Sequence, residues 1–328
     1  MSAPEISIII VNWNGEGFLA ECLGSIVENP PAHAFEIVVV DNASTDGSAE
    51  WLKSDECSRM LSGVLFRLIE PGENLGFGRA NNLGVASTSA ASILVLNPDT
   101  VVPDGAIERL HVTLWSDKRI GIVAPKLVFP DGSLQYSVVR LPETPLGIVI
   151  NGLAVNRIMP RRLFATWLYA DNWTYDKRRA VPVVAGAAMM CKREMYDQLG
   201  GFDPTIFMYG EDFELCVRVQ RAGWKIWFEP DAVIIHASEQ SASRRWSEEE
   251  RAAIQEQAVL DFEQRSFARP INLLNGVARI VVYSIHGWRM KLQGRDSGRV
   301  KSLRRINLEN CKRIVGGYLG IAQRPIDR

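Results

Sequence analysis

The feature that most constrains the fold is an alternation of apolar runs and helix-like stretches over about the first hundred residues. Runs rich in Val and Ile at residues 6–11, 35–40, 64–69 and 93–96 are typical of strands buried on both faces. Helical patterns separate them, at residues 18–27, 48–61 and 79–86. Such alternation predicts an α/β fold with a Rossmann-like, mostly parallel sheet that is flanked by helices.

Three polar residues, Asn12, Asp41 and Asp99, fall where predicted strands end, and ligands of such sheets bind at the carboxyl ends of the strands. Asp41 can accept hydrogen bonds from a nucleoside, or it simply caps the turn that follows. Asp99, with Asn97 or water, offers oxygen ligands to a hard divalent cation. The alternative is that residues 97–100 form an ordinary turn after a strand.

Two further stretches contain glycines that allow a close approach of the backbone. Residues 73–82 include Gly76 and Arg79, whose guanidinium suits a phosphate. Residues 181–192 are small and apolar around Gly186, which favours either a backbone that passes close to a ligand or a buried strand.

The stretch from residue 201 to 236 is where we expect the chemistry. Gly210 precedes two adjacent carboxylates, Glu211 and Asp212, at the start of a predicted helix. The helix dipole favours their ionised forms there, which suits a general base, although both could serve only as caps. Two short strands around a turn at residues 230–231 would then deliver His236 at a strand end.

The order of these pieces resembles the family 2 glycosyltransferases with the GT-A fold, and within them bacterial rhamnosyltransferases of cell-wall and O-antigen synthesis. The resemblance covers about residues 5–240. It is carried by these segments: 7–14 (SIIIVNWN), 40–48 (VDNASTDGS), 74–78 (NLGFG), 96–99 (LNPD), 200–203 (GGFD), 210–212 (GED) and His236. The family's Asp-x-Asp metal motif appears here as Asn97-Pro98-Asp99, whose first residue is neutral.

The resemblance implies a role for each matching residue. Asp41 would read a uracil or thymine ring, Asp99 and His236 would hold Mg²⁺ or Mn²⁺, and Asp212 would be the base, beside Glu211. Further contacts to the nucleotide sugar would come from Val11, Asn12, Asn14, Asn74, Gly76, Arg79, Asn81, Asn97 and Gly186. The implied reaction is the inverting transfer of a sugar, with rhamnose as a candidate, from a dTDP or UDP donor to a hydroxyl of a lipid-linked saccharide in cell-wall or surface polysaccharide synthesis.

The implied organisation is a GT-A catalytic domain at residues 1–242 and a basic helical extension at residues 243–328. Within the first, residues 1–120 would bind the nucleotide sugar and residues 121–242 the acceptor. Residues 140–179 carry aromatic residues among basic ones and are expected to form a loop or helical insert near the acceptor; the aromatic residues include Trp167, Tyr169, Trp173 and Tyr175.

Composition indicates a globular protein of the cytosol. The 328 residues are 47% hydrophobic and 23% charged. The five cysteines are scattered without a Cys-x-x-Cys pair, which argues against a zinc site or a disulfide framework. Met1 to Glu5 lead directly into a strand, so no signal peptide is expected, and no apolar run has the roughly 20 residues of a spanning helix.

The tail is strongly basic. Residues 265–328 carry 14 Lys and Arg against 3 Asp and Glu, a net +11, while the first 264 residues carry −12. The apolar stretch 271–288 followed by basic residues fits a helix in a membrane interface, so we expect a peripheral protein on the inner face of the plasma membrane. The stretch lacks the interleaved aromatics of a nucleic-acid site. The alternative is a helical pair that packs on the catalytic domain or on a second subunit, which leaves a homo-oligomer open.

Two other functions remain open on sequence alone. Residues 15–20 match Gly-x-Gly-x-x-Ala after the first strand, so a dinucleotide-dependent oxidoreductase is the main rival. However, Glu16 would bring a negative charge to the pyrophosphate of the dinucleotide. An oxidoreductase would also give no common role to Asp99, Asp212 and His236. A non-catalytic module that binds nucleotide sugars is the second rival, and it needs no base at position 212.

Overall fold

The structure is a computed structural model that describes residues 3–139, 174–237, 247–294 and 298–318, with isolated positions 145, 148, 149 and 153. The chain forms two compact units. Unit 1 comprises residues 1–139 and 170–242, and unit 2 comprises residues 140–169 and 243–328. Trp167, Tyr169 and Trp173 of the expected insert lie outside the described residues. Tyr175 is fully buried and packs edge-on against Phe228, so it belongs to the core of unit 1.

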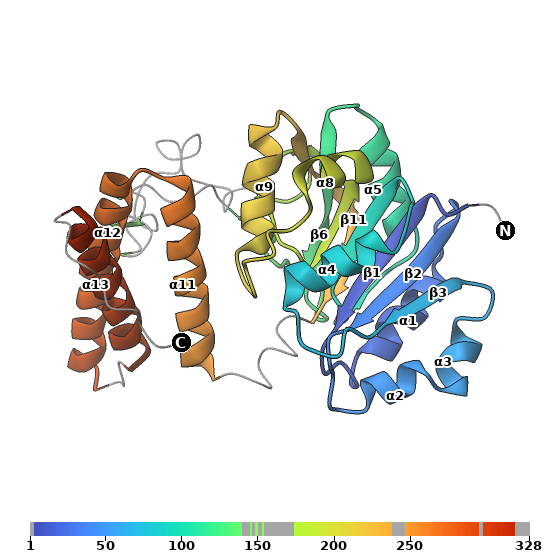
Figure 1. The fold of residues 1–328 in the computed structure, drawn as a ribbon, viewed down its shortest axis with the longest axis horizontal. Coiled ribbons are helices and arrows are strands. Elements are labelled where there is room, and N and C mark those ends of the chain that lie inside the picture. The colour runs from blue at the N-terminus through green and yellow to red at the C-terminus, as the bar shows by residue number, and fades with distance from the viewer. Residues whose placement is uncertain are drawn as a thin grey trace. The chain divides into compact units, whose positions relative to one another are not determined.

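Unit 1 is built on a mixed sheet of nine strands in the order β3-β2-β1-β4-β10-β6-β11-β5, with β8 paired to β11 (Figure 1). Its first four strands are parallel, as expected: β1 (Ile6–Asn12), β2 (Phe35–Asp41), β3 (Leu65–Ile69) and β4 (Ser92–Leu96). The others are β5 (Thr100–Val101), β6 (Ile120–Val128), β8 (Arg179–Ala180), β10 (Ala188–Lys192) and β11 (Lys225–His236). The strand β10 runs antiparallel to both of its neighbours. A separate pair joins β7 (Val138–Val139) to β9 (Val183–Val184).

Helices cover both faces of this sheet because the strands are apolar on both sides. Along β1, Ile8 and Ile10 join one hydrophobic cluster, with α1 and α5, while Ile9 joins the other, with α8 and α9. The helices of unit 1 are α1 (Leu19–Glu28), α2 (Ser48–Leu52), α3 (Asp55–Met60), α4 (Phe77–Ala86), α5 (Ala106–Trp115), α8 (Arg193–Leu199) and α9 (Glu211–Arg221).

Two expected elements differ from the structure. The single helix expected at residues 48–61 is two helices, because Ser54 is extended and its side chain accepts a hydrogen bond from Cys57 N, which starts α3. The two short strands expected around residues 230–231 are one strand, β11, with a shift of register against β6 between Glu229 and Val233. Glu229 is fully buried there and accepts a hydrogen bond from Thr113 Oγ1 at 2.6 Å, which holds the irregular stretch inside the sheet.

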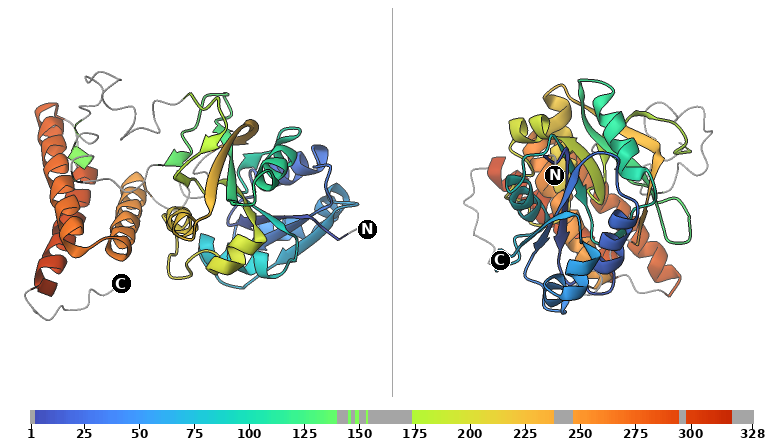
Figure 2. Two further views of the ribbon diagram at one scale, coloured as in Figure 1. Left: turned by 90° about the horizontal axis from the view of Figure 1, so that it is seen from above. Right: turned by 90° about the vertical axis from the view of Figure 1, so that its right-hand side faces the viewer.

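The helices described in unit 2 are α11 (Glu248–Ser266), α12 (Arg269–Leu292) and α13 (Gly298–Tyr318), seen from two further sides in Figure 2. A capping box between Ser247 and Glu250 starts α11. Ile148 packs against Ala278 and Val282 of α12. Within the described ranges, no helix combines the length and the apolar character needed to cross a membrane.

Candidate active site

The turn after β4 brings Asp99 to His236. Asn97-Pro98-Asp99 reverses the chain into β5, which pairs antiparallel with the end of β11 so that Thr100 lies opposite His236. Asp99 Oδ1 is 3.2 Å from His236 Nε2, and the two side chains are only 8% and 9% exposed. Asn97 Nδ2 lies 3.4 Å from the same ring nitrogen.

The other ring nitrogen of His236 explains why this arrangement suits a metal. Nδ1 lies 2.9 Å from Gln135 Oε1, which can only accept, so Nδ1 carries the proton and Nε2 presents its lone pair to Asp99. Two acceptors that face each other at this distance need a cation or a further proton between them. A carboxylate, an imidazole and the amide oxygen of Asn97 after rotation of its side chain are suitable ligands for Mn²⁺ or Mg²⁺.

Gln135 was missed by the sequence reasoning. It lies 101 positions from His236 and belongs to no recognised motif, so no local signal could have found it. Partners of this kind fix the tautomer and orientation of a metal-binding histidine.

Asp212 lies at the start of α9 and is held by backbone donors. Gly210 has φ of 87°, a left-handed conformation that starts the helix abruptly. Asp212 Oδ2 accepts a hydrogen bond from Gly186 N at 2.8 Å, and Oδ1 accepts one from Phe213 N at 2.7 Å. A Cβ at position 186 would lie 3.3 Å from Asp212 Cβ, so the glycine permits this close approach. Gly186 is thus both part of a buried segment of small residues and a direct partner of the expected base.

The environment of Glu211 differs from that of Asp212. Burial, and then the neighbouring charge of Asp212, raise the pKa of Glu211 to about 8. Burial also raises the pKa of Asp212, but the N–H groups of Gly186 and Phe213 oppose that rise. No described group donates a hydrogen bond to Glu211 Oε2. Burial thus opposes the ionised forms that the helix start is expected to favour, and at Asp212 the N–H groups of Gly186 and Phe213 offset part of that opposition.

Asp41 and Asn12 lie side by side at the ends of β2 and β1. Asn12 Nδ2 donates to Asp41 Oδ1 at 2.8 Å, and Ser44 N donates to Asp41 Oδ2 at 3.1 Å. Asp41 therefore does cap the following turn, and it is 3% exposed. The adjacent Asn42 holds the glycine-rich loop: its Oδ1 accepts from Leu75 N at 2.8 Å, and its Nδ2 donates to Asn74 Oδ1 at 2.9 Å.

One cavity of about 270 Å³ joins these groups at the carboxyl ends of the strands. Its lining includes nine of the residues that the sequence singled out: Val11, Asn74, Gly76, Asn97, Asp99, Gly186, Glu211, Asp212 and His236. It also includes Trp13, Asn42, Phe77, Met208 and Tyr209, which the sequence reasoning did not select. The cavity thus connects the ends of β1 and β4 to the start of α9.

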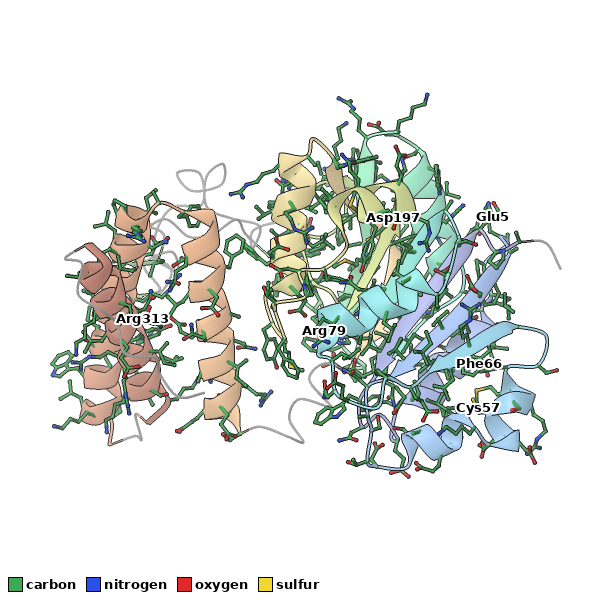
Figure 3. The ribbon with its side chains drawn as sticks, viewed as in Figure 1. Glu5, Cys57, Phe66, Arg79, Asp197 and Arg313 are labelled. Carbon is green, nitrogen blue, oxygen red and sulfur yellow. The ribbon has the colours of Figure 1, made fainter. Side chains whose placement is uncertain are left out.

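The remaining expected residues do not line this cavity: Asn12, Asn14, Asp41, Arg79 and Asn81. Asn14 Oδ1 accepts from Thr45 N and so holds the loop after β2, whereas Asn81 Nδ2 donates to Phe77 O within the first turns of α4. Arg79 is exposed on the first turn of α4, as labelled in Figure 3.

The segment at residues 15–20 is not built as a phosphate loop. Glu16 N donates to Asp46 Oδ2 at 2.9 Å, so the protein's own carboxylate uses this donor. A Cβ at Gly15 would meet Asn12 Oδ1 at 2.2 Å, so the glycine serves the packing of the Asn12 side chain. This geometry disfavours the dinucleotide-dependent oxidoreductase.

Comparison with known proteins decides the family. The model of the family described as "Glycosyltransferase like family 2" matches residues 4–254. The chain belongs to this family. It is therefore an enzyme that transfers glycosyl groups, and the expected relation to the family 2 glycosyltransferases is confirmed.

The relatives of this glycosyltransferase include rhamnosyltransferases. The chain is 28% identical over 242 residues to the N-acetylglucosaminyl-diphospho-decaprenol L-rhamnosyltransferase of Mycobacterium tuberculosis. The alignment covers 70% of this chain and 73% of that protein. It is also 26% identical over 242 residues to the rhamnosyltransferase WbbL of Escherichia coli, in an alignment that covers 70% of this chain and 83% of that protein.

Solved structures show the same fold at low identity. The mannosyltransferase PcManGT of Pyrobaculum calidifontis, in complex with GDP-Man and Mn²⁺, matches with a TM-score of 0.56 and 17% identity, over 99% of this chain and 78% of that one. GalNAc-T7 with UDP, GalNAc and Mn²⁺ matches with a TM-score of 0.57 and 17% identity, over 97% and 57% of the two chains. The α/β GT-A fold expected from the sequence is confirmed.

Proposed function

We propose that this glycosyltransferase is an inverting enzyme that moves a sugar, with L-rhamnose as the first candidate, from a dTDP or UDP donor to a hydroxyl of a lipid-linked saccharide. The observation that carries the proposal is that Asp99, His236 and Asp212 line one cavity. Rhamnose and the lipid-linked acceptor are suggested by the names of the two relatives. The proposed catalytic part is residues 1–242, with residues 243–328 as its extension.

The donor is proposed to lie with its diphosphate at Asp99 and His236. A bound divalent cation would be held by these two side chains, with Asn97 beside them, and would stabilise the charge that develops on the leaving nucleoside diphosphate. Asn42 and Asn74, which line the cavity, are proposed to form the nucleoside end of the site together with the neighbouring Asp41 and Asn12. The exposed side chain of Arg79, at the start of α4, is proposed to contact a phosphate of the donor.

Asp212 is proposed to act as the general base. The two backbone donors on its oxygens favour its ionised form, and the proton on Glu211 avoids a second charge beside it. Asp212 would take the proton of the acceptor hydroxyl as that oxygen attacks the anomeric carbon from the face opposite the leaving group. One base and one displacement invert the configuration, so no second carboxylate is needed as a nucleophile.

A donor screen tests this proposal. Purified protein is incubated with dTDP- and UDP-sugars, with and without a polyprenyl-linked saccharide acceptor, and release of the nucleoside diphosphate is measured. Release that depends on the acceptor, is lost with EDTA and returns with Mn²⁺ or Mg²⁺ is the expected result. Asp99→Ala should fail to respond to the added metal. Binding of a donor without turnover in any combination would favour the non-catalytic module instead.

A membrane surface is the proposed location of the acceptor and of unit 2. The helix α12 exposes a stripe of apolar side chains between residues 271 and 292, and these are Ile271, Leu274, Val277, Val281, Trp288 and Leu292. On a helical wheel of about 100° per residue the six fall within roughly 120°, the geometry of a helix that lies in an interface. Arg289 and Lys291 flank the stripe at its C-terminal end, where anionic headgroups of the inner leaflet would attract them. A second copy of the chain is the alternative occupant of this face.

A further inference from the structure

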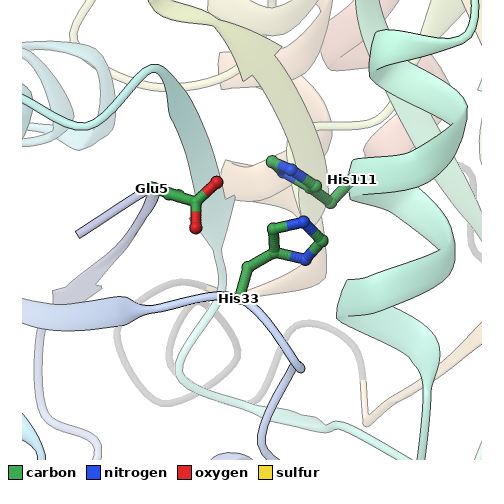
Figure 4. Close-up of side chains that lie close together, drawn as sticks. All are labelled: Glu5, His33 and His111. Carbon is green, nitrogen blue, oxygen red and sulfur yellow. The ribbon is translucent and has the colours of Figure 1, made fainter. Parts of the chain in front are cut away.

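Three side chains meet at the end of the sheet opposite the candidate active site. Glu5 directly precedes β1, His33 lies in the loop before β2, and His111 lies on α5. Each can offer one ligand atom, and these atoms all lie within 4.8 Å of one another. Figure 4 shows the Glu5 carboxylate and the two imidazole rings turned toward one space.

The two imidazoles are oriented by partners on their other ring nitrogens. His33 Nδ1 lies 3.0 Å from Glu108 Oε2, so it donates its proton there and leaves Nε2 with a lone pair. His111 Nδ1 lies 3.1 Å from Ser92 Oγ, which also accepts from Trp115 Nε1 at 3.0 Å. A hydroxyl oxygen can accept two hydrogen bonds, so His111 can donate from Nδ1 and bind a metal through Nε2. A carboxylate behind a histidine is the usual support of a zinc ligand.

The backbone fixes the third ligand between the other two. Glu5 N donates to Ala34 O at 2.7 Å, next to His33, and Glu5 O accepts from Ser92 N at 3.0 Å, next to the support of His111. Glu5 is exposed, and its side chain extends from an ordered strand start. A shift of the ligand atoms by about 1 Å would bring them to the spacing set by metal bonds of about 2.0–2.2 Å.

We propose that Glu5, His33 and His111 form a second metal site, distinct from Asp99 and His236, that takes Zn²⁺ or a similar transition-metal ion. Two imidazoles and one carboxylate suit zinc, with water in the fourth position, whereas the oxygen-richer set at Asp99 suits Mn²⁺ or Mg²⁺. The ion would join three segments that are far apart in the sequence, and it would stabilise the start of the parallel sheet.

The test measures Zn²⁺ binding by full-length protein carrying His236→Ala, which removes the other site. Calorimetry should find one Zn²⁺ per chain, and Zn²⁺ at about a hundredfold excess over its Kd should raise Tm by about 5 °C or more. Adding His33→Ala or Glu5→Gln should abolish both effects, and adding Glu108→Gln should weaken binding about 10- to 100-fold. His33 is a third exposed and Glu5 is exposed, so both variants are expected to fold.

The matched control is His286→Ala in the same background, because His286 is the one other histidine of the chain and lies on α12. It should bind Zn²⁺ as the parent does. The proposal is overturned if the His236→Ala protein binds no Zn²⁺, or if His33→Ala and Glu5→Gln leave the stoichiometry and the Tm shift unchanged.

Discussion

Glu211 and Asp212 are neighbours in the chain, yet their surroundings differ. Asp212 accepts hydrogen bonds from two backbone N–H groups, whereas Glu211 is buried and its Oε2 receives none from the described residues. Pairs of carboxyls whose environments separate their pKa values often divide the roles of acid and base between them. This difference between adjacent side chains is why we assign the base to Asp212.

Replacing Asp212 by Asn should abolish most of the turnover. Loss of a general base typically costs about 10² to 10⁴ in rate, or roughly 3–5 kcal/mol of barrier. Donor binding should persist, since Asn can still accept the hydrogen bond from Gly186. The comparison is with Glu211→Gln, which should lose less. Initial rates of nucleoside diphosphate release decide the matter, and a near-normal rate in Asp212→Asn would refute the assignment.

The raised pKa of Glu211 predicts a dependence of stability on pH. Its ordinary value is 4.5 and its value in the folded protein is about 8, so between these pH values the folded state binds more protons than the unfolded state. Stability therefore falls as pH rises from about 4.5 to 8, and the favourable contribution is fully present below that window. Melting curves of the metal-free proteins at pH 5 and pH 8.5 give the measurement. Between these pH values the Tm of the wild type should fall further than the Tm of Glu211→Gln. Parallel falls in the two proteins would contradict the assignment of the proton.

Gln135 is predicted to position His236 for its ligand. Gln135→Ala should weaken Mn²⁺ binding by about 10- to 100-fold, as loss of a partner behind a metal ligand usually does. Electron paramagnetic resonance of free Mn²⁺ measures this without turnover. The control is Gln198→Ala, whose side chain bonds Trp224 on the surface and should leave the affinity unchanged. Equal affinities of the two variants would show that the contact of Gln135 with His236 does not matter for metal binding.

At the scale of elements, short strands decide which side chains meet. The strand β5 has two residues, yet its pairing with the end of β11 places Asp99 beside His236.

In unit 2 a buried ion pair connects two helices. Arg279 of α12 donates to both oxygens of Glu263 on α11, at 2.9 and 2.6 Å. Asn275 Nδ2 also donates to Glu263, at 2.9 Å. These bonds connect α11 with α12 through buried polar side chains.

Breaking this buried pair should destabilise unit 2 strongly. Glu263→Ala leaves Arg279 buried, and among the described residues Glu256, at 3.8 Å from its Nε, is then its remaining carboxylate partner, so the expected loss is roughly 3–5 kcal/mol. The matched control is Glu248→Ala, on the same helix, where the pair with Arg299 is exposed and contributes about 1 kcal/mol or less. Urea unfolding followed by circular dichroism compares the two. A similar midpoint for both would mean that the buried pair contributes little.

At the scale of the whole molecule, charge and apolar surface are distributed unevenly. The first 264 residues carry a net −12 and the last 64 carry +11. The apolar stripe of α12 lies in the basic part, which is the combination expected of a segment that binds an anionic membrane.

The proposed membrane contact predicts that one substitution on this stripe reduces vesicle binding. Burying a Val side chain in an apolar environment contributes about 1.5–3 kcal/mol to the free energy of binding. Val281→Asp removes this contribution, so the affinity for vesicles should fall tenfold or more. The control is Val112→Asp on α5, since Val112 is also exposed but lies in unit 1. Flotation with anionic and neutral vesicles at low and high salt gives the measurement. If Val281→Asp and Val112→Asp float as the wild type does, α12 is not the anchor, and sedimentation then tests whether it joins two copies of the chain.

The amino-acid sequence alone could predict the parallel half of the sheet, the helix that follows Gly210 and most residues of the cavity. It could do so because burial of a strand or a helix face leaves a short-range periodic pattern, and because polar residues interrupt that pattern where strands end. Three features required the three-dimensional fold: the antiparallel placement of β10, the meeting of His236 with both Asp99 and Gln135, and the burial that raises the pKa of Glu211. These depend on strand pairing across about a hundred residues and on burial by distant segments, and neither leaves a local trace in the sequence.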